Sequence, residues 1–318
     1  MIFLVLIIVL FVIEQQYFHL AIKYKIFDKP NERSLHSNIV IRGGGIIFVL
    51  SSLLYFVFSN FQYQVFFFGL ITIALISFWD DICTISNKHR VVVHFLSIYL
   101  LLYQLDSFTH LGLYIFLLSI ILVGIINAFN FMDGINGMTG GYSLVCLLSL
   151  QFINCCHIQF IDSEFIFFEL LGIIVFIFFN FRIQAKCFAG DVGSVSIAFV
   201  IVFLLLKLIL LTNQYIYILF LSLYGIDTVY TLLVRIRLKE NIFKAHKTHL
   251  FQLLVQKIPL SHIQVSGLYI IIQMLVNSII ILIINFHLEG LWLFILITLT
   301  SIYVYCRVKI VKMPITIK

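Results

Sequence analysis

The chain has 318 residues, of which 62% are hydrophobic and 11% are charged, and its mean hydropathy is +1.13. So few polar residues cannot cover a soluble domain, and the apolar runs do not alternate as the strands of a membrane barrel do. The composition therefore predicts an all-α polytopic membrane protein. The net charge of +6 favours an anionic membrane leaflet as partner, and no nucleic-acid binding is expected.

Apolar runs of membrane-spanning length follow one another along the whole chain. We predict eleven spans, at about residues 2–22, 44–60, 64–80, 91–105, 111–127, 139–154, 165–180, 193–211, 215–234, 263–286 and 290–306. No repeat or soluble segment divides them, so residues 1–318 are predicted to form one integral-membrane domain. The first run lacks a preceding basic segment and a small-residue cleavage site, so we interpret it as a span and not as a signal peptide.

Lys and Arg residues lie almost entirely on one side of these predicted spans. The connections 23–43, 81–90, 181–192 and 235–262, together with the C-terminal tail, hold 19 of the 20 basic residues. The positive-inside rule places these connections in the cytoplasm, with the N-terminus periplasmic and the C-terminus cytoplasmic. The exception is Lys207, which lies late in the eighth span and can reach the outer interface.

The connection 127–141, NAFNFMDGINGMTGG, also falls on the cytoplasmic side but has no Lys or Arg. Three Asn, one Asp and four Gly between two membrane-length runs suit a polar ligand held at the membrane surface. The alternative is a tight loop in which Asn and Gly only supply turn conformations.

Two adjacent carboxylates, Asp80 and Asp81, close the third predicted span. Negative charges at the C-terminal end of a helix face the negative end of its dipole, which is unfavourable by up to about 1 kcal/mol each. We expect an offset by a divalent cation, by the nearby Lys88 and Arg90, or by a proton shared with a substrate. A solvated helix end is the structural alternative.

The sequence GDVGS, residues 190–194, opens the eighth span. The N–H groups of a helix N-terminus attract anions, and Asp191 among them suits a ligand of Mg²⁺ that in turn holds phosphates. A simple N-cap role for Asp191 is the alternative. Because DGINGMTGG opens the sixth span in the same way, we expect two helix starts to hold a pyrophosphate jointly.

The connections 23–43 and 235–262 are basic and contain further candidates. Arg42 precedes three glycines and can pair with a phosphate through two hydrogen bonds. His246 and His249, in AHKTHLFQ, lie on one face if that segment is helical, and with the surrounding Lys and Arg they suit phosphate. Binding of Zn²⁺ is a weaker alternative for these two histidines. The alternative without a functional role is that both connections are ordinary basic inner loops.

Two acidic residues, Glu14 and Asp227, fall inside predicted spans. Ionisable residues within a membrane usually face the bundle interior and are candidates for function. The spacing assigns neither of them a role.

Together these segments resemble the polyprenyl-phosphate N-acetylhexosamine-1-phosphate transferases, the MraY/WecA superfamily of glycosyltransferase family 4 type. The resemblance extends from about Asp28 to Gln252. It depends on DKPNERSLH with IRGGG, Asp80–Asp81, NAFNFMDGINGMTGG, AKCFAGDVGS and AHKTHLFQ, in that order. Among the departures, Asn136 stands where many members have a second Asp. The compact loops are more similar to the O-antigen or capsule initiating branch than to the peptidoglycan branch.

The resemblance implies a bacterial inner-membrane enzyme with a cytoplasmic active site and an Mg²⁺ cofactor, with Mn²⁺ as an alternative. Its implied reaction joins UDP-N-acetylhexosamine and undecaprenyl phosphate, giving undecaprenyl-diphospho-N-acetylhexosamine and UMP. Because both reactants are anions, such a site needs a divalent cation and cationic side chains. The identity of the sugar, the glycan and a homodimer stay open.

The resemblance also implies roles for single residues. Asp191 is the implied Mg²⁺ ligand; Asp80 deprotonates or orients the lipid phosphate, and Asp81 assists at the metal. The implied nucleotide-binding residues are Asn130, Asp133 and Asn136, and the implied phosphate-binding residues are Arg42, His246 and His249. Direct attack by the lipid phosphate is favoured, with a covalent phospho-aspartyl route as the alternative.

A membrane transporter of a phosphorylated or lipid-linked substrate is the main alternative function. A transporter of that kind has polar residues near the bilayer midplane and broken helices, whereas the polar clusters here lie at one surface. A CDP-alcohol phosphotransferase would need a D-G-x2-A-R pattern, which the sequence does not contain.

Overall fold

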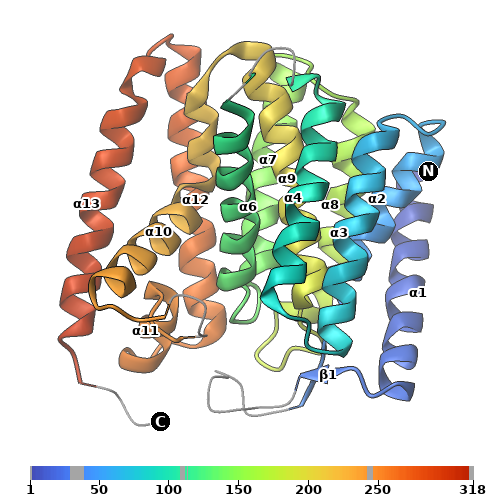
Figure 1. Cartoon of the computed structure of the whole chain (residues 1–318), viewed down its shortest axis with the longest axis horizontal. Helices are drawn as coiled ribbons and strands as arrows, with labels where there is room; N and C mark the ends of the chain where they lie inside the picture. Colours follow the sequence, from blue (N-terminus) through green and yellow to red (C-terminus); the bar gives the residue numbers. More distant parts are fainter. Residues whose placement is uncertain (1, 29–38, 108–111, 113, 242–245, 315–318) are drawn as a thin grey trace.

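The computed structural model describes residues 2–28, 39–107, 112, 114–241 and 246–314. Figure 1 shows a bundle of long helices that run mostly side by side. The helices are α1 (Ile2–Lys23), α2 (Ile46–Phe58), α3 (Gln64–Ile82), α4 (Asn87–Gln104), α6 (Tyr114–Met132), α7 (Met138–Cys156), α8 (Ser163–Asn180), α9 (Gly190–Thr212), α10 (Ser222–Arg237), α11 (Leu250–Lys257), α12 (His262–Asn285) and α13 (Trp292–Val311). The prediction of a helical polytopic fold is confirmed.

Every one of the eleven predicted spans coincides with a helix in the described part of the chain. Nine of these helices are long and apolar enough to cross a membrane. Of the other two, α2 is shorter, with 13 residues, and α4 begins with the polar residues Asn87–Arg90. The ninth predicted span combines a 3₁₀ turn, η1 (Tyr215–Leu221), with α10.

Helix α9 forms the centre of the bundle. It is apolar on all sides and almost every one of its residues is buried, as expected for a helix that other helices surround. Helices α2, α3, α6 and α7 pack against it. By contrast, α1 and α13 lie at opposite flanks and expose many large apolar side chains (Figure 1). The start of α9 is therefore held from several sides.

Two small elements in the cytoplasm-assigned connections were not predicted. Strands β1 (Phe27–Asp28) and β2 (Val40–Ile41) form a two-residue antiparallel ladder, and Ile41 forms a further bridge with Cys187. The other element is α11, an amphipathic helix of eight residues in the connection 235–262. The ladder leads directly into Arg42, so it fixes the start of one candidate segment.

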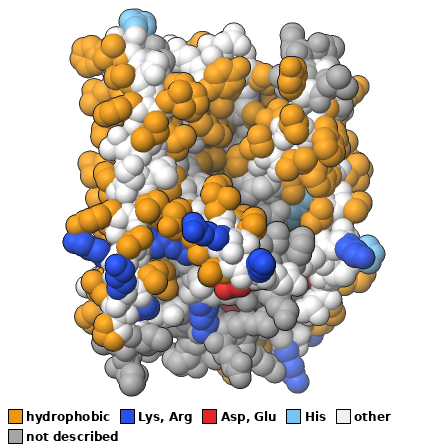
Figure 2. Space-filling view, turned by 60° about the vertical axis from the view of Figure 1, so that its left-hand side comes forward, with side chains coloured by type: hydrophobic (Ala, Val, Ile, Leu, Met, Phe, Trp, Pro, Cys, Tyr) orange, Lys and Arg blue, Asp and Glu red, His pale blue; other side chains and the backbone are white. Residues whose placement is uncertain are grey.

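One end of the bundle carries the polar connections. Figure 1 shows β1, α11 and the end of α13 at this end, while α1 begins toward the opposite one. Figure 2 shows Lys and Arg side chains gathered toward the same end, below a broad hydrophobic zone. The exception Lys207 contacts Tyr63, the residue before α3, with its Nζ 3.0 Å from the Tyr63 hydroxyl. Since α3 ends at the polar end, Lys207 lies toward the other.

Candidate active site

Asp81, at the last turn of α3, is bound by the first turn of α9. The backbone N–H groups of Asp191 and Val192 donate to its two carboxylate oxygens at 2.9 and 3.0 Å, and Arg42 Nε lies 2.7 Å from Oδ1. The positive end of the α9 dipole thus faces a carboxylate that its own helix would disfavour. This contact explains how an acid can end α3 while being only 7% exposed.

Asp80 turns toward the α3–α4 connection. Its Oδ1 accepts a hydrogen bond from the N–H of Ile85 at 2.6 Å, and Arg90 Nη1 lies 2.7 Å from Oδ2. Arg90 stands in the first turn of α4, directly after the connection that Asp80 begins. Of the two basic residues expected near the acidic pair, the structure therefore selects Arg90, while Lys88 is exposed.

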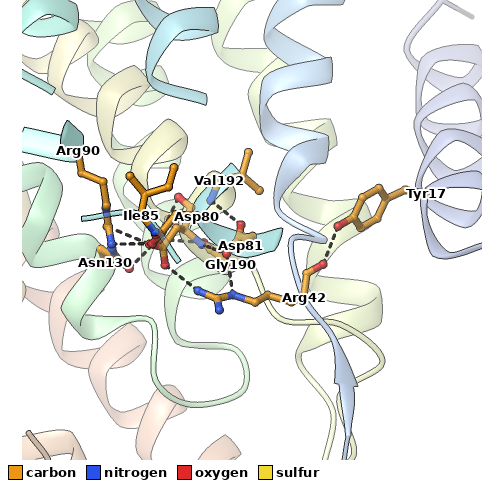
Figure 3. Close-up of polar contacts among 11 residues, drawn as sticks. Tyr17, Arg42, Asp80, Asp81, Ile85, Arg90, Asn130, Gly190 and Val192 are labelled. Carbon is orange, nitrogen blue, oxygen red and sulfur yellow. Dashed lines mark hydrogen bonds and ion pairs between the residues drawn. The ribbon is translucent and has the colours of Figure 1, made fainter. Parts of the chain in front are cut away.

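Asp191 connects the Asp81–Arg42 pair with the Asp80–Arg90 pair. Arg42 Nη2 lies 3.3 Å from its Oδ1 and Arg90 Nη2 lies 2.9 Å from its Oδ2. Asp80 also interacts with Asp191, so two carboxyl groups are in direct contact. Figure 3 shows these side chains converging from α3, α4, α9 and the segment after β2. Three predicted site residues and Arg42 are thus brought together, and the sequence analysis missed Arg90 as a full member.

The N-cap alternative for Asp191 is wrong. Ala189 is the residue before α9, Asp191 lies inside the first turn, and the side chain that accepts from the first-turn N–H groups is that of Asp81. The carboxylate of Asp191 instead faces the two guanidinium groups. Among the described residues it has no backbone partner, unlike Asp81, and this leaves it open to an added cation.

The glycines of IRGGG and AGDVGS serve close backbone packing. Gly44 and Gly45 donate N–H bonds to the carbonyls of Phe188 and Ala189 at 2.9 and 3.1 Å. A Cβ built on Gly45 would lie 2.4 Å from the Cα of Gly193, which no real contact allows. Gly190 has φ +71°, a conformation that favours glycine. These close contacts bring the two motifs side by side, so Arg42 meets Asp191.

Arg42 is held at its backbone as well as at its side chain. The hydroxyl of Tyr17, in α1, donates to the Arg42 carbonyl at 2.6 Å (Figure 3). Burial opposes the charge on this side chain, but the carboxylates of Asp81 and Asp191 outweigh it and raise the guanidinium pKa. Arg42 is therefore cationic at any physiological pH.

The connection 127–141 lies next to this cluster through one contact. The Ser194 hydroxyl lies 3.4 Å from Asn130 Oδ1, which places Asn130 beside the first turn of α9. Asp133 accepts a hydrogen bond from the Thr139 hydroxyl at 2.6 Å. Although part of Asp133 reaches the surface, the protein packed around its carboxyl group raises the pKa to about 7, and the Thr139 bond opposes this only in part.

Asn136 is largely committed to the fold. Its side-chain amide nitrogen donates to the backbone carbonyls of Arg182 and Ile183 at 2.8 and 3.2 Å, and its backbone carbonyl accepts from the Ser266 hydroxyl. The structure thus gives Asn136 contacts that hold the loop. Its implied place near a nucleotide stays a prediction.

The expectation that two helix starts offer free N–H groups to a pyrophosphate is wrong for three of these groups. The N–H groups of Asp191 and Val192 are bound to Asp81, and that of Gly137 donates to Asn180 Oδ1 at 2.7 Å. Asn180 in turn donates to the carbonyl of Cys187 at 2.8 Å. The side chains of Asp81 and Asn180 occupy the positions that we predicted for phosphate. The sequence did not indicate that these side chains contact the two helix starts.

The two histidines of AHKTHLFQ lie together but not on a helix face. His249 is the residue before α11, His246 lies ahead of it, and their ring centroids are 4.9 Å apart. Burial lowers the pKa of His246 to about 4, and the nearby guanidinium of Arg235 adds to the effect. No group of three His, Cys, Asp or Glu suited to a metal occurs in the described part of the chain, so the zinc alternative gains no support.

One motif of the resemblance lies mostly outside the described residues. Of DKPNERSLH, only Asp28 is described. Arg33 and His36 thus stay at the level of sequence.

Comparisons with known proteins find one family model and several relatives that are similar to this chain. Residues 63–209 match the family model described as "Glycosyl transferase family 4". A "Probable undecaprenyl-phosphate N-acetylglucosaminyl 1-phosphate transferase" of Bacillus subtilis is 27% identical over 73% of this chain and 70% of its own length. An "Undecaprenyl-phosphate alpha-N-acetylglucosaminyl 1-phosphate transferase" of Salmonella typhi is 30% identical over 59% of this chain.

A third relative matches a shorter part of the chain. The "Phospho-N-acetylmuramoyl-pentapeptide-transferase" of Dictyoglomus thermophilum is 34% identical over 48% of this chain. The matches cover 56% of the Salmonella protein and 55% of the Dictyoglomus protein. All three relatives are named as phospho-sugar transferases. The match of residues 63–209 to the glycosyl transferase family 4 model and the names of these relatives fit the family that the motifs of the chain resemble.

Proposed function

We propose that this protein transfers a HexNAc-1-phosphate group from a UDP-N-acetylhexosamine to undecaprenyl phosphate and releases UMP. The observation that carries the proposal is the cluster in which Asp80, Asp81 and Asp191 meet Arg42 and Arg90 at the basic end of a membrane bundle. Such a cluster can face a lipid phosphate and a soluble nucleotide sugar together. The names of the relatives supply the substrate class.

The donor set at the cluster fits Mg²⁺. Magnesium in proteins usually binds through one or two carboxylates, with waters and substrate phosphates as its other ligands. Asp191 and Asp80, whose carboxyl groups contact each other, are the pair that would hold it. When bound, the ion would neutralise charge on the phosphates during transfer.

The residues of the cluster divide the remaining work. The lipid phosphate attacks the β-phosphate of the nucleotide sugar, and Asp80, at the edge of the cluster, orients it or takes its proton. Arg42 and Arg90 present guanidinium groups that can turn from carboxylate to phosphate, which binds them in the same two-bond geometry. Asp81, bound to the start of α9, keeps the two helix ends together while assisting at the metal.

The neighbouring connections would bind the rest of the donor substrate. Asn130 lies against the first turn of α9, so a nucleotide beside the cluster would meet it first. Asp133 and Asn136 line the same connection. His246 and His249 would contact the diphosphate. The reaction would take place on the cytoplasmic face of a bacterial inner membrane and begin a cell-surface glycan of the O-antigen or capsule type.

The test is transfer of label into lipid. Purified protein in undecaprenyl-phosphate-containing liposomes is given each of a panel of labelled UDP-N-acetylhexosamines, with Mg²⁺, Mn²⁺ or EDTA. We expect label in the organic-extractable fraction and an equal amount of UMP with at least one sugar, and no transfer with EDTA. Absence of both products with every sugar of the panel would refute the proposal.

A further inference from the structure

A second buried carboxylate, Asp227, lies outside the carboxylate–arginine cluster. It belongs to α10, is 0% exposed, and is surrounded by donors. The Leu250 N–H lies 3.1 and 3.2 Å from its two oxygens, the Tyr269 hydroxyl donates at 2.8 Å and the Tyr303 hydroxyl at 3.0 Å. His249 Nδ1 lies 3.1 Å from Oδ1. With so many donors, Asp227 is an ionised acceptor.

These partners come from three different helices. Tyr269 lies in α12, Tyr303 lies in α13, and Leu250 begins α11. Arg307, also in α13, lies 3.9 Å from Asp227 and donates to the Tyr303 hydroxyl at 2.8 Å. The last helices of the chain thus converge on one carboxylate, and among the described residues the ring nitrogen that this carboxylate contacts is that of His249.

The contact with Asp227 determines which nitrogen of the His249 ring carries a proton. A carboxylate with two accepting oxygens can bind Nδ1 only if that nitrogen carries a proton. We therefore assign Nδ1 as the protonated nitrogen, which leaves Nε2 as the atom that can accept or exchange a proton. In the described part of the chain Nε2 is buried and has no hydrogen-bond partner, and the residue is 2% exposed.

His249 lies beside the connection 127–141. Its ring centroid is 6.3 Å from that of Phe131, and the Phe251 ring packs against Gly134, where an added Cβ would lie 3.0 Å from it. An unsatisfied imidazole nitrogen in a buried place costs free energy unless something binds it. Beside a connection that would receive a nucleotide diphosphate, the matching group is a phosphate oxygen, which accepts a hydrogen bond from Nε2 when that nitrogen also carries a proton.

We propose that Asp227 is a positioning residue, which holds the His249 ring by Nδ1–H so that Nε2 is the atom offered to a substrate phosphate. This inference rests on the proposed function and deepens it, because it adds a residue that acts through His249. Arg307 and the two tyrosines hold Asp227 in turn.

A purely structural role for Asp227 is the competing explanation. A buried ion pair often adds little net stability, and apolar residues of similar volume can replace it without loss. The two explanations differ in one measurable respect. A positioning residue has its effect on activity only while His249 is present, whereas a structural residue has it in any background.

The first test is a double-mutant cycle on transfer activity. Asp227→Asn keeps the shape of the side chain but can meet Nδ1 with an N–H, so we expect kcat to fall roughly 10- to 100-fold, as for other partners that orient a histidine. The KM for the nucleotide sugar should change little. In a His249→Gln background, Asp227→Asn should cost nothing further.

The matched control is Glu169→Gln, in α8. Glu169 is likewise 0% exposed and accepts a hydrogen bond from Ser52, but it has no part in the histidine contact. We expect its activity to equal that of the wild type. Equal losses from Asp227→Asn with and without His249 would overturn the proposal.

The second test needs neither activity nor a folded Asp227 variant. In ¹⁵N-histidine-labelled wild-type protein, the signal lost in His249→Gln identifies the ring of His249. We expect its shifts to show a protonated Nδ1, and a ring protonated only at Nε2 would refute the positioning role. A wild type that transfers no sugar would count against the proposed function alone.

Discussion

Asp80, Asp81 and Asp191 are all carboxylates, but each is held in a different way. Asp81 has both oxygens bound by backbone N–H groups and Asp80 has one so bound. In the described part of the chain Asp191 is held by two guanidinium groups and contacts the carboxyl group of Asp80. Salt links of this kind exchange more readily than backbone hydrogen bonds inside a fold. Among single residues, Asp191 is therefore the one best placed to accept a new cation.

Asp191→Asn should abolish transfer while the protein still inserts and folds. The amide removes one charge from the pair that would hold Mg²⁺, but its oxygen can still accept a hydrogen bond from one of the two arginines. The measurement is UMP release together with membrane yield and elution profile. Glu164→Gln, an exposed acid at the start of α8, is the control and should keep full activity. An active Asp191→Asn variant would remove the metal assignment.

Arg90→Gln should lower kcat/KM at least tenfold, equivalent to about 1.4 kcal/mol. Arg90 joins Asp80 to Asp191, and its loss leaves two acids in contact with less compensation. Lys88→Gln, an exposed change in the same connection, serves as the control and should have little effect. Equal activities of the two variants would show that the arginine bridge is dispensable.

Asp133 should give the stability of the protein a pH dependence. Its folded pKa of about 7 lies above the usual value of an aspartate, so between about pH 4 and 7 only the unfolded chain is ionised there. Its contribution to stability is complete at low pH and is lost as the pH rises through 7.

Asp133→Asn cannot ionise, and its amide oxygen can still accept from Thr139. Its free energy of unfolding in detergent should therefore exceed that of the wild type by a margin that grows from about pH 5 to 7 and is constant above. The margin is roughly 2 kcal/mol at most because Asp133 is partly exposed, and melting temperatures measured across this pH range follow it. A margin that does not change with pH would mean that the carboxyl group titrates normally.

At the scale of elements, the close contact between the segment after β2 and the start of α9 positions the site. Gly45→Ala would place a methyl group 2.4 Å from the Gly193 Cα, so one backbone must move. We expect a loss of about 1–3 kcal/mol of stability and a larger loss of activity, since Arg42 and Asp191 lie on the two segments. Assays of melting temperature and transfer measure both.

The control for this substitution is Gly124→Ala in α6. A Cβ at Gly124 would meet nothing within 4 Å, so alanine there should be neutral or slightly stabilising in a helix. If the two variants behave alike, close packing at Gly45 is not required for the site.

The sequence predicted the helices well because apolar runs of membrane length leave few other structures. It also grouped Asp80, Asp81, Asp191 and Arg42 on one side, because charge asymmetry orders the connections. It could not pair them, since a contact such as that between Asp81 and the start of α9 joins residues 110 positions apart. For the same reason, the sequence did not reveal the contact between Arg90 and Asp191 or the contact between Asp227 and His249.

At the scale of the whole molecule, the basic residues at one end predict how the protein sits in the membrane. Green fluorescent protein fused after residue 312 should fluoresce, because it would remain in the cytoplasm. Alkaline phosphatase fused after residue 62, between α2 and α3, should be active in the periplasm. The opposite pattern would place the carboxylate–arginine cluster on the outer face, away from soluble nucleotide sugars.

The central place of α9 has a consequence for how the protein is made. Ribosomes deliver α1 to α8 to the membrane before α9, yet α9 ends up enclosed by four of them. Arg42 and Asp81 must wait, with their charges at the lipid–water boundary, until residues 190–192 have been synthesised. The earlier helices must therefore leave a gap or separate again to admit α9, and the carboxylate–arginine cluster can form only at that moment of biogenesis.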